Sequence, residues 1–329
     1  MEYVNFGSAG VKVSPIALGL GLRGQSSAQE AQRLIEHAIA CGINLIDCAN
    51  VYNLLDGHHG HRPGEAETIL ARVLKTKRDD VVITSKVTSA IGPGPNDSGF
   101  SRYHIMREVE RSLRRLETDH IDVYILHQFD RNTPLEEAVR ALDDLTRQGK
   151  VCYVGCSNFV AWQICRGLWI QDTIGASPFI CVQNQYSLMN RTDERELFPL
   201  LTDRGLGMMA YSPLGVGLLS GAYEPGVAPR SGSYWETRQR KTYDTVFRGT
   251  GARVYETVAA IAAQRGKTVA QIALNWVISQ PRITVAISGS DTIEQLDDNL
   301  GALGWCLSEN ELCRLDEVSR PMRTPRDDG

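Results

Sequence analysis

The sequence contains no Cys-x-x-Cys pair, although eight cysteines are spread along its 329 residues. Several of these cysteines fall inside apolar segments that have the character of strands or helices. Cysteines with this spacing and these neighbours are typical of reduced, buried thiols, not of a disulfide framework. We therefore expect a cytoplasmic protein.

Membrane segments and an excess of positive charge are also missing. No apolar run approaches the ~20 residues that a membrane-spanning helix needs, and Met1–Asn5 has neither the basic region nor the apolar run of a signal peptide. The net charge is −4 and the pI is about 6.0, which does not favour nucleic acid or an anionic membrane as a partner. We expect a small-molecule partner, and a homo-oligomer is compatible with this composition.

The sequence does contain a regular alternation of short apolar strands with amphipathic helices. A hairpin pattern at residues 3–13 comes first. Each later strand is followed by a segment with helical spacing, which predicts repeated βαβ units and a parallel sheet. The expected strands cover residues 16–20, 43–46, 81–85, 121–126, 151–155, 180–183, 207–211 and 283–287.

Eight such units predict an α/β fold of the (β/α)8 barrel type, for which ~250 residues is the usual size. The surplus fits the hairpin, a long loop at residues 221–250 after the seventh strand, and extra C-terminal helices. We expect a single domain over residues 1–329, with a disordered tail at 321–329. A doubly wound open sheet is the alternative. Residues 19–24 come close to its glycine-rich turn, but no acidic residue follows in the ribose-binding place, since Asp47 comes too late.

Four polar residues stand at or just past the ends of three successive strands. Asp47 ends the second strand and Tyr52 lies in the loop beyond it, whereas Lys86 and His127 end the third and fourth strands. In a closed parallel barrel these ends share one rim, where barrel enzymes keep their chemistry. Each residue alone has a structural explanation, such as a hydrogen-bonded barrel residue or, for Lys86, a surface lysine. Their occurrence together favours one shared site.

These four residue types suit the delivery of a proton to a carbonyl oxygen. A tyrosine can protonate a developing alkoxide if its pKa of ~10 is lowered, and a neighbouring lysine ammonium lowers it. An aspartate keeps the lysine charged and in place, and a histidine can orient the carbonyl by a hydrogen bond. The set has no nucleophile–base pair and no electron sink, so hydride from a nicotinamide is the economical source of electrons.

From about Tyr3 to Ser319 the sequence resembles the aldo-keto reductase superfamily. The catalytic Asp, Tyr, Lys and His of that family match the four residues above. Its Gly-x-Ser-Asn motif matches residues 155–158, and its Gln-x-x-Tyr motif matches Gln183 and Tyr186. The chain looks more like bacterial sugar and xenobiotic reductases and potassium-channel β subunits than like aldose reductases.

The resemblance also implies a set of residues that bind a nicotinamide dinucleotide. The carboxamide would be held by Ser157, Asn158 and Gln183. The ring of Tyr211 would stack on the nicotinamide, and the pyrophosphate would be cradled by Ser212, Pro213, Leu214 and Gly217. The adenosine end would lie against Gly289, Ser290, Asp291, Gln295 and Asn299.

Two positions bear on the choice between NADP(H) and NAD(H). Ala222 stands where many relatives have a lysine, and Asp291 stands near the expected ribose 2′-phosphate. A carboxylate repels that phosphate and can accept a hydrogen bond from a free 2′-hydroxyl, which favours NAD(H). The preference of the family favours NADP(H), and on balance we expect NADP(H) to be slightly favoured over NAD(H). Basic residues of the long loop offer phosphate partners, namely Arg230, Arg238, Arg240 and Lys241.

By this resemblance we expect an NAD(P)(H)-dependent oxidoreductase that acts on an aldehyde, ketone or sugar-like carbonyl, with Tyr52 as general acid or base. The alternative is a cofactor-binding regulatory subunit like the potassium-channel β subunits, because an intact tetrad fits both. A third hypothesis, a metal-dependent hydrolase, rests on His58, His59 and His61 after Tyr52. These histidines lie in mid-loop and not at a strand end, so we expect a solvated loop and no metal.

Overall fold

The computed structural model of the chain describes residues 1–22, 24–54 and 62–320. The histidines His58, His59 and His61 and the tail at 321–329 lie outside the described residues. The expectations about a solvated loop and a disordered tail therefore stay predictions.

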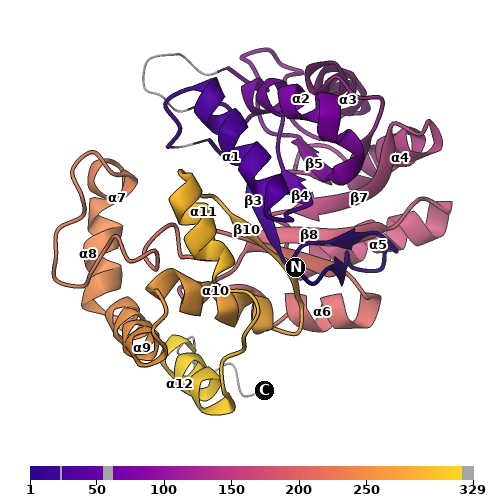
Figure 1. Cartoon of the computed structure of the whole chain (residues 1–329). Coiled ribbons are helices and arrows are strands. Elements are labelled where there is room, and N and C mark those ends of the chain that lie inside the picture. The colour runs from indigo at the N-terminus through magenta and orange to yellow at the C-terminus, as the bar shows by residue number, and fades with distance from the viewer. Residues whose placement is uncertain (23, 55–61, 321–329) are drawn as a thin grey trace.

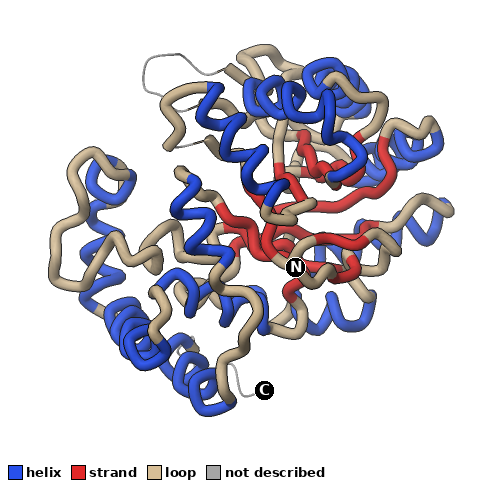
Figure 2. Tube along the Cα trace, viewed as in Figure 1, coloured by secondary structure: helices blue, strands red, loops and turns tan. Residues whose placement is uncertain are grey.

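Eight parallel strands close into a barrel at the centre of the molecule (Figure 2). The last strand pairs in parallel with the first, with Ser288 opposite Leu18, and this pairing closes the ring. The predicted (β/α)8 barrel is confirmed. The strands in chain order are β3 (Ile16–Gly19), β4 (Leu45–Asp47), β5 (Val82–Val87), β6 (Ile121–Leu126), β7 (Val151–Ser157), β8 (Phe179–Gln185), β9 (Gly207–Tyr211) and β10 (Ile283–Ser288).

The predicted N-terminal hairpin covers one end of the barrel. Strand β1 (Val4–Asn5) pairs antiparallel with β2 (Lys12–Val13), and Phe6 is fully buried among the side chains that fill the barrel. Gly7 has a φ of +60°, and a Cβ at this position would stand 2.1 Å from the carbonyl oxygen of Ile180. Only glycine tolerates both conditions. The hairpin therefore closes the end of the barrel opposite the C-terminal strand ends.

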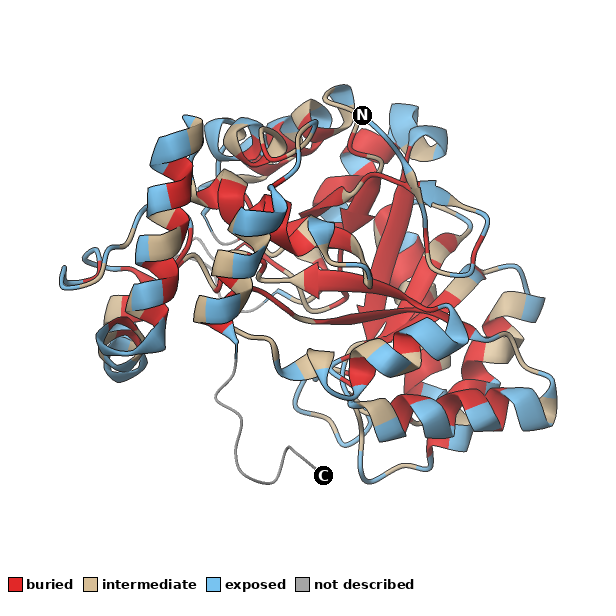
Figure 3. Cartoon of the chain, turned by 90° about the horizontal axis from the view of Figure 1, so that it is seen from below, coloured by how far each residue is buried: buried red, intermediate tan, exposed pale blue. Residues whose placement is uncertain are grey.

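Helices surround the barrel with their buried faces toward the strands (Figure 1; Figure 3). In α4 the buried residues Leu135, Ala138 and Leu142 recur every three to four positions, which is the spacing of one helix face. Ser27 and Thr268 cap α1 and α10 by accepting backbone N–H groups. The helices around the barrel are α1 (Ala28–Ala40), α2 (Glu65–Lys77), α3 (Arg102–Leu116), α4 (Leu135–Arg147), α5 (Ala161–Ile174), α6 (Leu197–Arg204), α9 (Thr250–Arg265), α10 (Val269–Ser279), α11 (Ile293–Leu300) and α12 (Glu309–Ser319), with a 3-10 turn, η1 (Arg78–Asp80), after α2.

The segment at residues 221–250 is not the continuous loop that its Gly, Pro and Arg content predicted. It contains α7 (Tyr234–Thr237) and α8 (Arg240–Arg248), which lie to the side of the barrel next to α9 (Figure 1). The prediction was wrong because most of the glycines and both prolines of this segment lie in its first part. The second part carries aromatic side chains that become buried against one another, namely Trp235, Tyr243 and Phe247.

Between β8 and β9 the chain forms a 3-10 turn, η2 (Thr192–Glu194), followed by α6. Side-chain contacts fix the turn, because the Glu194 carboxylate accepts hydrogen bonds from Tyr186 at 2.5 Å and from Arg191 at 2.6 Å. Arg191 also donates to Asp316 Oδ1 at 3.0 Å, a contact between distant segments that helical spacing does not reveal. Among the described residues, none of the helices combines the length and the apolar character that crossing a bilayer requires.

Candidate active site

The alternation of side chains along the strands aims the predicted residues into the barrel. Leu45 and Ile125 belong to the side chains that fill its interior, and positions two apart along a strand share one face. Asp47 and His127 follow them by two positions and therefore face inward at the C-terminal strand ends. Lys86 pairs with Ile125 across β5 and β6 and is fully buried, so the interpretation of Lys86 as a surface lysine is wrong.

Lys86 joins Asp47 and Tyr52 through a buried hydrogen-bond network. Its Nζ donates to Asp47 Oδ2 at 2.8 Å and to the backbone oxygen of Cys48 at 2.7 Å, and it lies 3.2 Å from the hydroxyl oxygen of Tyr52. These three contacts use the three donors of an ammonium group. Lys86 is 0% exposed and Asp47 is 3% exposed, so the geometry of the network is fixed by the surrounding protein.

The pKa of Tyr52 differs from the sequence-based expectation. Burial raises it above the usual value, and the ammonium of Lys86 lowers it only in part, because the carboxylate of Asp47 again raises it. The expectation that Lys86 brings the pKa below ~10 is therefore wrong for the protein on its own. Burial alone would lower the pKa of Lys86, but Asp47 and Tyr52 raise it above its usual value. Lys86 is charged and Tyr52 is a neutral phenol, which is the form that donates a proton.

His127 stands beside Tyr52 as a neutral imidazole. Burial, with the charge of Lys86 added, lowers the pKa of His127 to about 3. The two rings are in edge contact, with centroids 5.8 Å apart at an angle of 77°. The Oγ of Ser89 lies 3.1 Å from Nδ1 of His127. When Ser89 donates to Nδ1, the ring proton resides on Nε2, so the ring can donate one hydrogen bond from Nε2.

Three supporting residues complete this network. Thr84 donates to Asp47 Oδ1 at 2.5 Å, and Gln183, assigned above to the nicotinamide carboxamide, donates to the same oxygen at 2.8 Å. Thr84 precedes Lys86 by two positions in one strand, so the period-two pattern could have revealed it. Ser89 lies in the loop after β5, and no pattern in the sequence singles it out.

Asn158 links the expected nicotinamide side to the catalytic residues. Its Nδ2 donates to the backbone oxygen of His127 at 2.8 Å and to Ser157 Oγ at 3.1 Å, and its Oδ1 accepts from the hydroxyl of Tyr211 at 2.7 Å. Asn158 has a φ of +59°, which asparagine tolerates better than most residues. Three of the predicted cofactor residues therefore form one connected group with the catalytic loop.

The chain is similar to known proteins over nearly its whole length. Residues 15–320 match the model of the Aldo/keto reductase family. The chain is 34% identical to the uncharacterized oxidoreductase YrpG of Bacillus subtilis (strain 168), over 97% of this chain and 96% of that protein. It is 32% identical to a probable voltage-gated potassium channel subunit beta of Arabidopsis thaliana, over 92% and 91%. It is 31% identical to an L-glyceraldehyde 3-phosphate reductase of Escherichia coli (strain K12), over 96% and 92%.

The chain belongs to the aldo/keto reductase family. Membership supports, in general terms, an oxidoreductase that uses a nicotinamide cofactor.

The segment after β9 forms a tight series of turns in this aldo/keto reductase. Ser212 and Val216 have φ values of +51° and +57°, and Gly217 has a φ of +86°. Pro213 is buried and Leu214 is partly buried within the same segment. Backbone turns that mix left- and right-handed residues direct successive N–H groups into concave sites that suit anions. This conformation is compatible with the predicted pyrophosphate cradle.

Trp235 anchors α7 to that segment. Its indole Nε1 donates to the backbone oxygen of Val216 at 2.9 Å, and the residue is 6% exposed. The neighbouring Tyr234 is 45% exposed. For Trp235 the structure supports a role in anchoring the loop.

The expected adenosine end is organised by internal hydrogen bonds. Asn299 Nδ2 donates to the hydroxyl oxygens of Ser288 and Ser290, both at 3.0 Å. Gln25 Nε2 donates to the backbone oxygens of Ser290 at 3.2 Å and Asp291 at 3.0 Å. Asn299 therefore holds the turn in shape, and Gln25 is a residue of this region that the sequence did not identify.

Asp291 closes this turn against the first strand–helix loop. Its backbone N–H donates to Gln295 Oε1 at 2.8 Å, and its carboxyl group packs on Gly24, where an added Cβ would stand 2.3 Å from Asp291 Cγ. Among the described residues, no atom outside the adjacent residues of the chain lies within 4 Å of a Cβ added at Gly289. The predicted adenosine residues thus surround one turn between β10 and α11.

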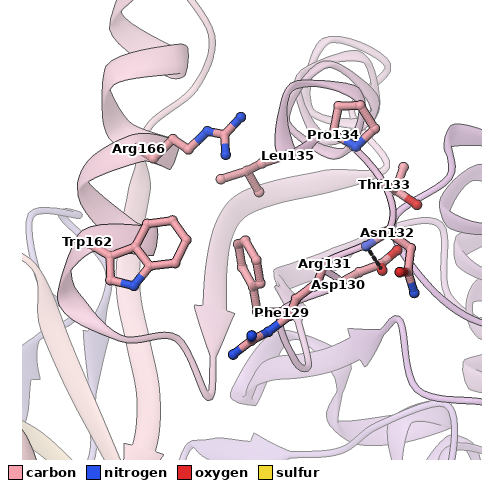
Figure 4. A pocket seen from close by; sticks show the side chains of 9 residues that line it. All are labelled: Phe129, Asp130, Arg131, Asn132, Thr133, Pro134, Leu135, Trp162 and Arg166. Atoms are coloured by element: carbon pink, nitrogen blue, oxygen red, sulfur yellow. Dashed lines mark hydrogen bonds between the residues drawn. The ribbon is translucent and has the colours of Figure 1, made fainter.

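A groove outside the barrel is separate from this site (Figure 4). It has a volume of about 390 Å³ and is bounded by residues 129–135 and, on α5, by Trp162 and Arg166. The rings of Phe129 and Trp162 meet edge to face, with centroids 5.8 Å apart. None of the predicted site residues lines this groove, although His127 precedes it in the same loop. The groove therefore provides no part of the catalytic arrangement.

Proposed function

We propose that the chain is an NAD(P)(H)-dependent aldo-keto reductase that reduces the carbonyl group of an aldehyde, ketone or sugar-like substrate. The main support is the 3.2 Å approach of the buried Lys86 Nζ to the Tyr52 hydroxyl, with neutral His127 in ring contact with that tyrosine. Together these groups provide one proton donor and one neutral hydrogen-bond donor at the same rim, as carbonyl reduction requires.

The residues present fit a nicotinamide dinucleotide. The 212–217 turns can direct N–H groups at a pyrophosphate, and Gly289 leaves open space at the adenosine end. The buried Oε1 of Gln25 has no hydrogen-bond partner among the described residues. An orphaned acceptor of this kind is unfavourable unless a donor arrives from outside the chain. Ser157, Asn158, Tyr211 and the turn around Ser290 would hold the cofactor.

A bound nicotinamide ring supplies the hydride for reduction of the carbonyl carbon. Tyr52 donates its hydroxyl proton to the carbonyl oxygen as negative charge develops there. The ammonium of Lys86 stabilises the tyrosinate that remains, and Asp47 keeps the ammonium in place. His127 donates a hydrogen bond from Nε2 to the same carbonyl oxygen and orients it. In the oxidative direction Tyr52 acts as the base.

The cofactor preference is a balance of two effects. The family resemblance favours NADP(H), and the carboxylate of Asp291 beside the expected ribose favours NAD(H) by repulsion of a 2′-phosphate. Arg240 is one of the basic residues considered above as a phosphate partner. Its Nε lies 3.3 Å from Oδ1 of Asp244 on α8. NADP(H) stays slightly favoured.

A regulatory subunit is the second candidate, because one relative is named as a probable potassium channel subunit beta. That candidate retains cofactor binding but does not require useful turnover. Steady-state assays with NADPH and NADH on 4-nitrobenzaldehyde and on DL-glyceraldehyde separate the two. The reductase proposal predicts substrate-dependent oxidation of at least one cofactor. Tight cofactor binding without turnover on any carbonyl would contradict it and favour the regulatory candidate.

A further inference from the structure

Three potential metal ligands meet on the outside of the barrel, between α1 and α11. His37 lies in the last turn of α1, Cys41 follows one turn later at the C-cap, and Asp297 lies on α11. Nε2 of His37 is 2.7 Å from Asp297 Oδ1 and 3.5 Å from Cys41 Sγ. All three ligand atoms lie within 4.8 Å of one another.

The separation of these atoms is close to that of a tetrahedral zinc site. Zn–N and Zn–S bonds of about 2.0 and 2.3 Å place the two ligand atoms roughly 3.5 Å apart, which is the distance between His37 and Cys41. Asp297 must retreat by roughly half an ångström to replace its hydrogen bond with a metal bond. Its side chain is 53% exposed and that of His37 is 32% exposed, so an ion can reach the set.

The charge around the set also favours a cation. Within the described part of the chain, His37 is the one side chain that forms an ion pair with Asp297. Glu294 lies one turn before Asp297 on α11 and adds a second carboxylate to this end of the helix. Helical neighbours three and four positions apart share a face, so His37 with Cys41 and Glu294 with Asp297 form two such pairs.

A second His–Asp–Cys set provides an internal comparison. It consists of His120, Asp122 and Cys152. There the carboxylate is already engaged, because Asp122 Oδ2 accepts hydrogen bonds from Arg78 at 2.9 Å and from the backbone N–H of Ile83 at 2.8 Å. A guanidinium beside the carboxylate repels a divalent cation, so this second set is the poorer metal-binding site.

We propose that His37, Cys41 and Asp297 form a binding site for a divalent ion of the zinc type, with a water molecule or Glu294 at the fourth position. A nitrogen, a sulfur and an oxygen ligand suit Zn²⁺. The sequence analysis considered a metal only at the histidines after Tyr52, and it did not identify this set because Asp297 comes from the other end of the chain. The ion acts as a structural bridge between α1 and α11, outside the catalytic chemistry.

The proposed ion site lies on the helix that follows the turn at Ser290 and Asp291. α11 begins at Ile293, two residues after Asp291, and Asn299 of the same helix donates to Ser290 in that turn. An ion bound to α1 and α11 restrains this region and stabilises the folded chain by mass action. Metal binding requires the thiolate of Cys41, so it releases a proton from that thiol.

The test is a titration of the full-length protein with Co²⁺ under metal-free, reducing conditions. A cysteine ligand gives a thiolate-to-cobalt charge-transfer band in the near ultraviolet. We expect a band that saturates at one equivalent and disappears when Zn²⁺ is added. Cys41→Ser removes the band, and Asp297→Asn weakens Co²⁺ affinity at least tenfold. Cys152→Ser, the matched control in the second set, leaves both unchanged.

Folding of the variants is checked by circular dichroism, and the melting temperature gives a second readout that does not depend on the charge-transfer band. Zn²⁺ should raise the melting temperature of the unmodified protein and should not raise that of Cys41→Ser or His37→Gln. The proposal is overturned if no charge-transfer band forms, if the band survives Cys41→Ser, or if it is lost in Cys152→Ser. Each of these results is independent of whether the protein reduces carbonyls.

Discussion

Lys86 holds its ammonium nitrogen 3.2 Å from the hydroxyl oxygen of Tyr52 while it donates to Asp47 at 2.8 Å. The two contacts have opposite effects on the tyrosine, since the ammonium lowers its pKa and the carboxylate raises it. Burial has the largest effect and raises the pKa of Tyr52, so Tyr52 is protonated at neutral pH. The charge of Lys86 then counts most after proton transfer, when a tyrosinate stands beside it.

Replacement of Lys86 by methionine tests this role. We expect kcat to fall by about 100-fold or more, which is the usual size of a lost acid–base contribution. The pKa of Tyr52 should rise further, so any alkaline limb of the pH–rate profile moves to higher pH. An unchanged rate and profile would show that Lys86 does not act on the tyrosine.

A control separates this effect from loss of stability. Lys86→Met alone leaves the buried carboxylate of Asp47 without its cation, which costs on the order of 3–5 kcal/mol in the free energy of unfolding. The double variant Lys86→Met/Asp47→Asn removes both charges. Urea unfolding should show that the double variant recovers much of the stability, and its activity should stay as low as that of the single variant.

His127 makes stability depend on acidity. Its pKa is about 3 in the folded protein and near 6.5 when unfolded. Between these values only the unfolded chain binds the proton, so the free energy of unfolding falls by up to about 1.4 kcal/mol for each pH unit below 6.5. The His127→Gln variant should lose part of this slope in urea unfolding between pH 4 and pH 7. An equal slope in both proteins would mean that His127 is not held neutral.

Ser89 is predicted to set the tautomer of His127. Ser89→Ala removes the hydroxyl 3.1 Å from Nδ1, so the ring proton is no longer directed to Nε2, and kcat/KM should fall by roughly tenfold, as for one lost hydrogen bond. Ser89→Thr keeps the hydroxyl and should retain most of the activity. Nitrogen-15 NMR of labelled histidine reads the tautomer directly. A tautomer that is the same in Ser89→Ala and the unmodified protein would refute the assignment.

Asp291 is predicted to disfavour a 2′-phosphate. Asp291→Asn removes the charge with little change in shape, and Asp291→Arg reverses the charge. Both should shift the ratio of NADPH to NADH affinity toward NADPH, by roughly tenfold for the arginine. Fluorescence titration of the five tryptophans with each cofactor measures the ratio. If neither variant changes it, the Asp291 carboxyl group lies away from the ribose.

Much of the fold followed from the sequence because a parallel barrel repeats one local pattern. Apolar runs such as 121–126 and 207–211 became β6 and β9 with the predicted bounds. The parallel order of the strands likewise led to the expectation that Asp47 and Lys86 share one rim, because the C-terminal strand ends of a closed parallel barrel lie together. Patterns of this kind are local, so a sequence displays them directly.

The parts that the sequence did not provide depend on contacts between distant segments. Ser89 meets His127 across two loops, and Gln25 meets Ser290 from opposite ends of the chain. The net pKa of Tyr52 required knowledge of its burial as well as of its charged neighbours. The helices α7 and α8 were missed because their stability comes from buried aromatic contacts, which helical propensity does not report.

The most direct test of the account is a comparison of Tyr52→Phe with the unmodified protein in two assays, cofactor binding and reduction of 4-nitrobenzaldehyde. Loss of the hydroxyl removes the proton donor but leaves the residues that hold the cofactor. The account predicts that the affinity for NADPH or NADH stays within about twofold while kcat falls by at least about 100-fold. Turnover by Tyr52→Phe at the rate of the unmodified protein would contradict the assignment of Tyr52 as the proton donor.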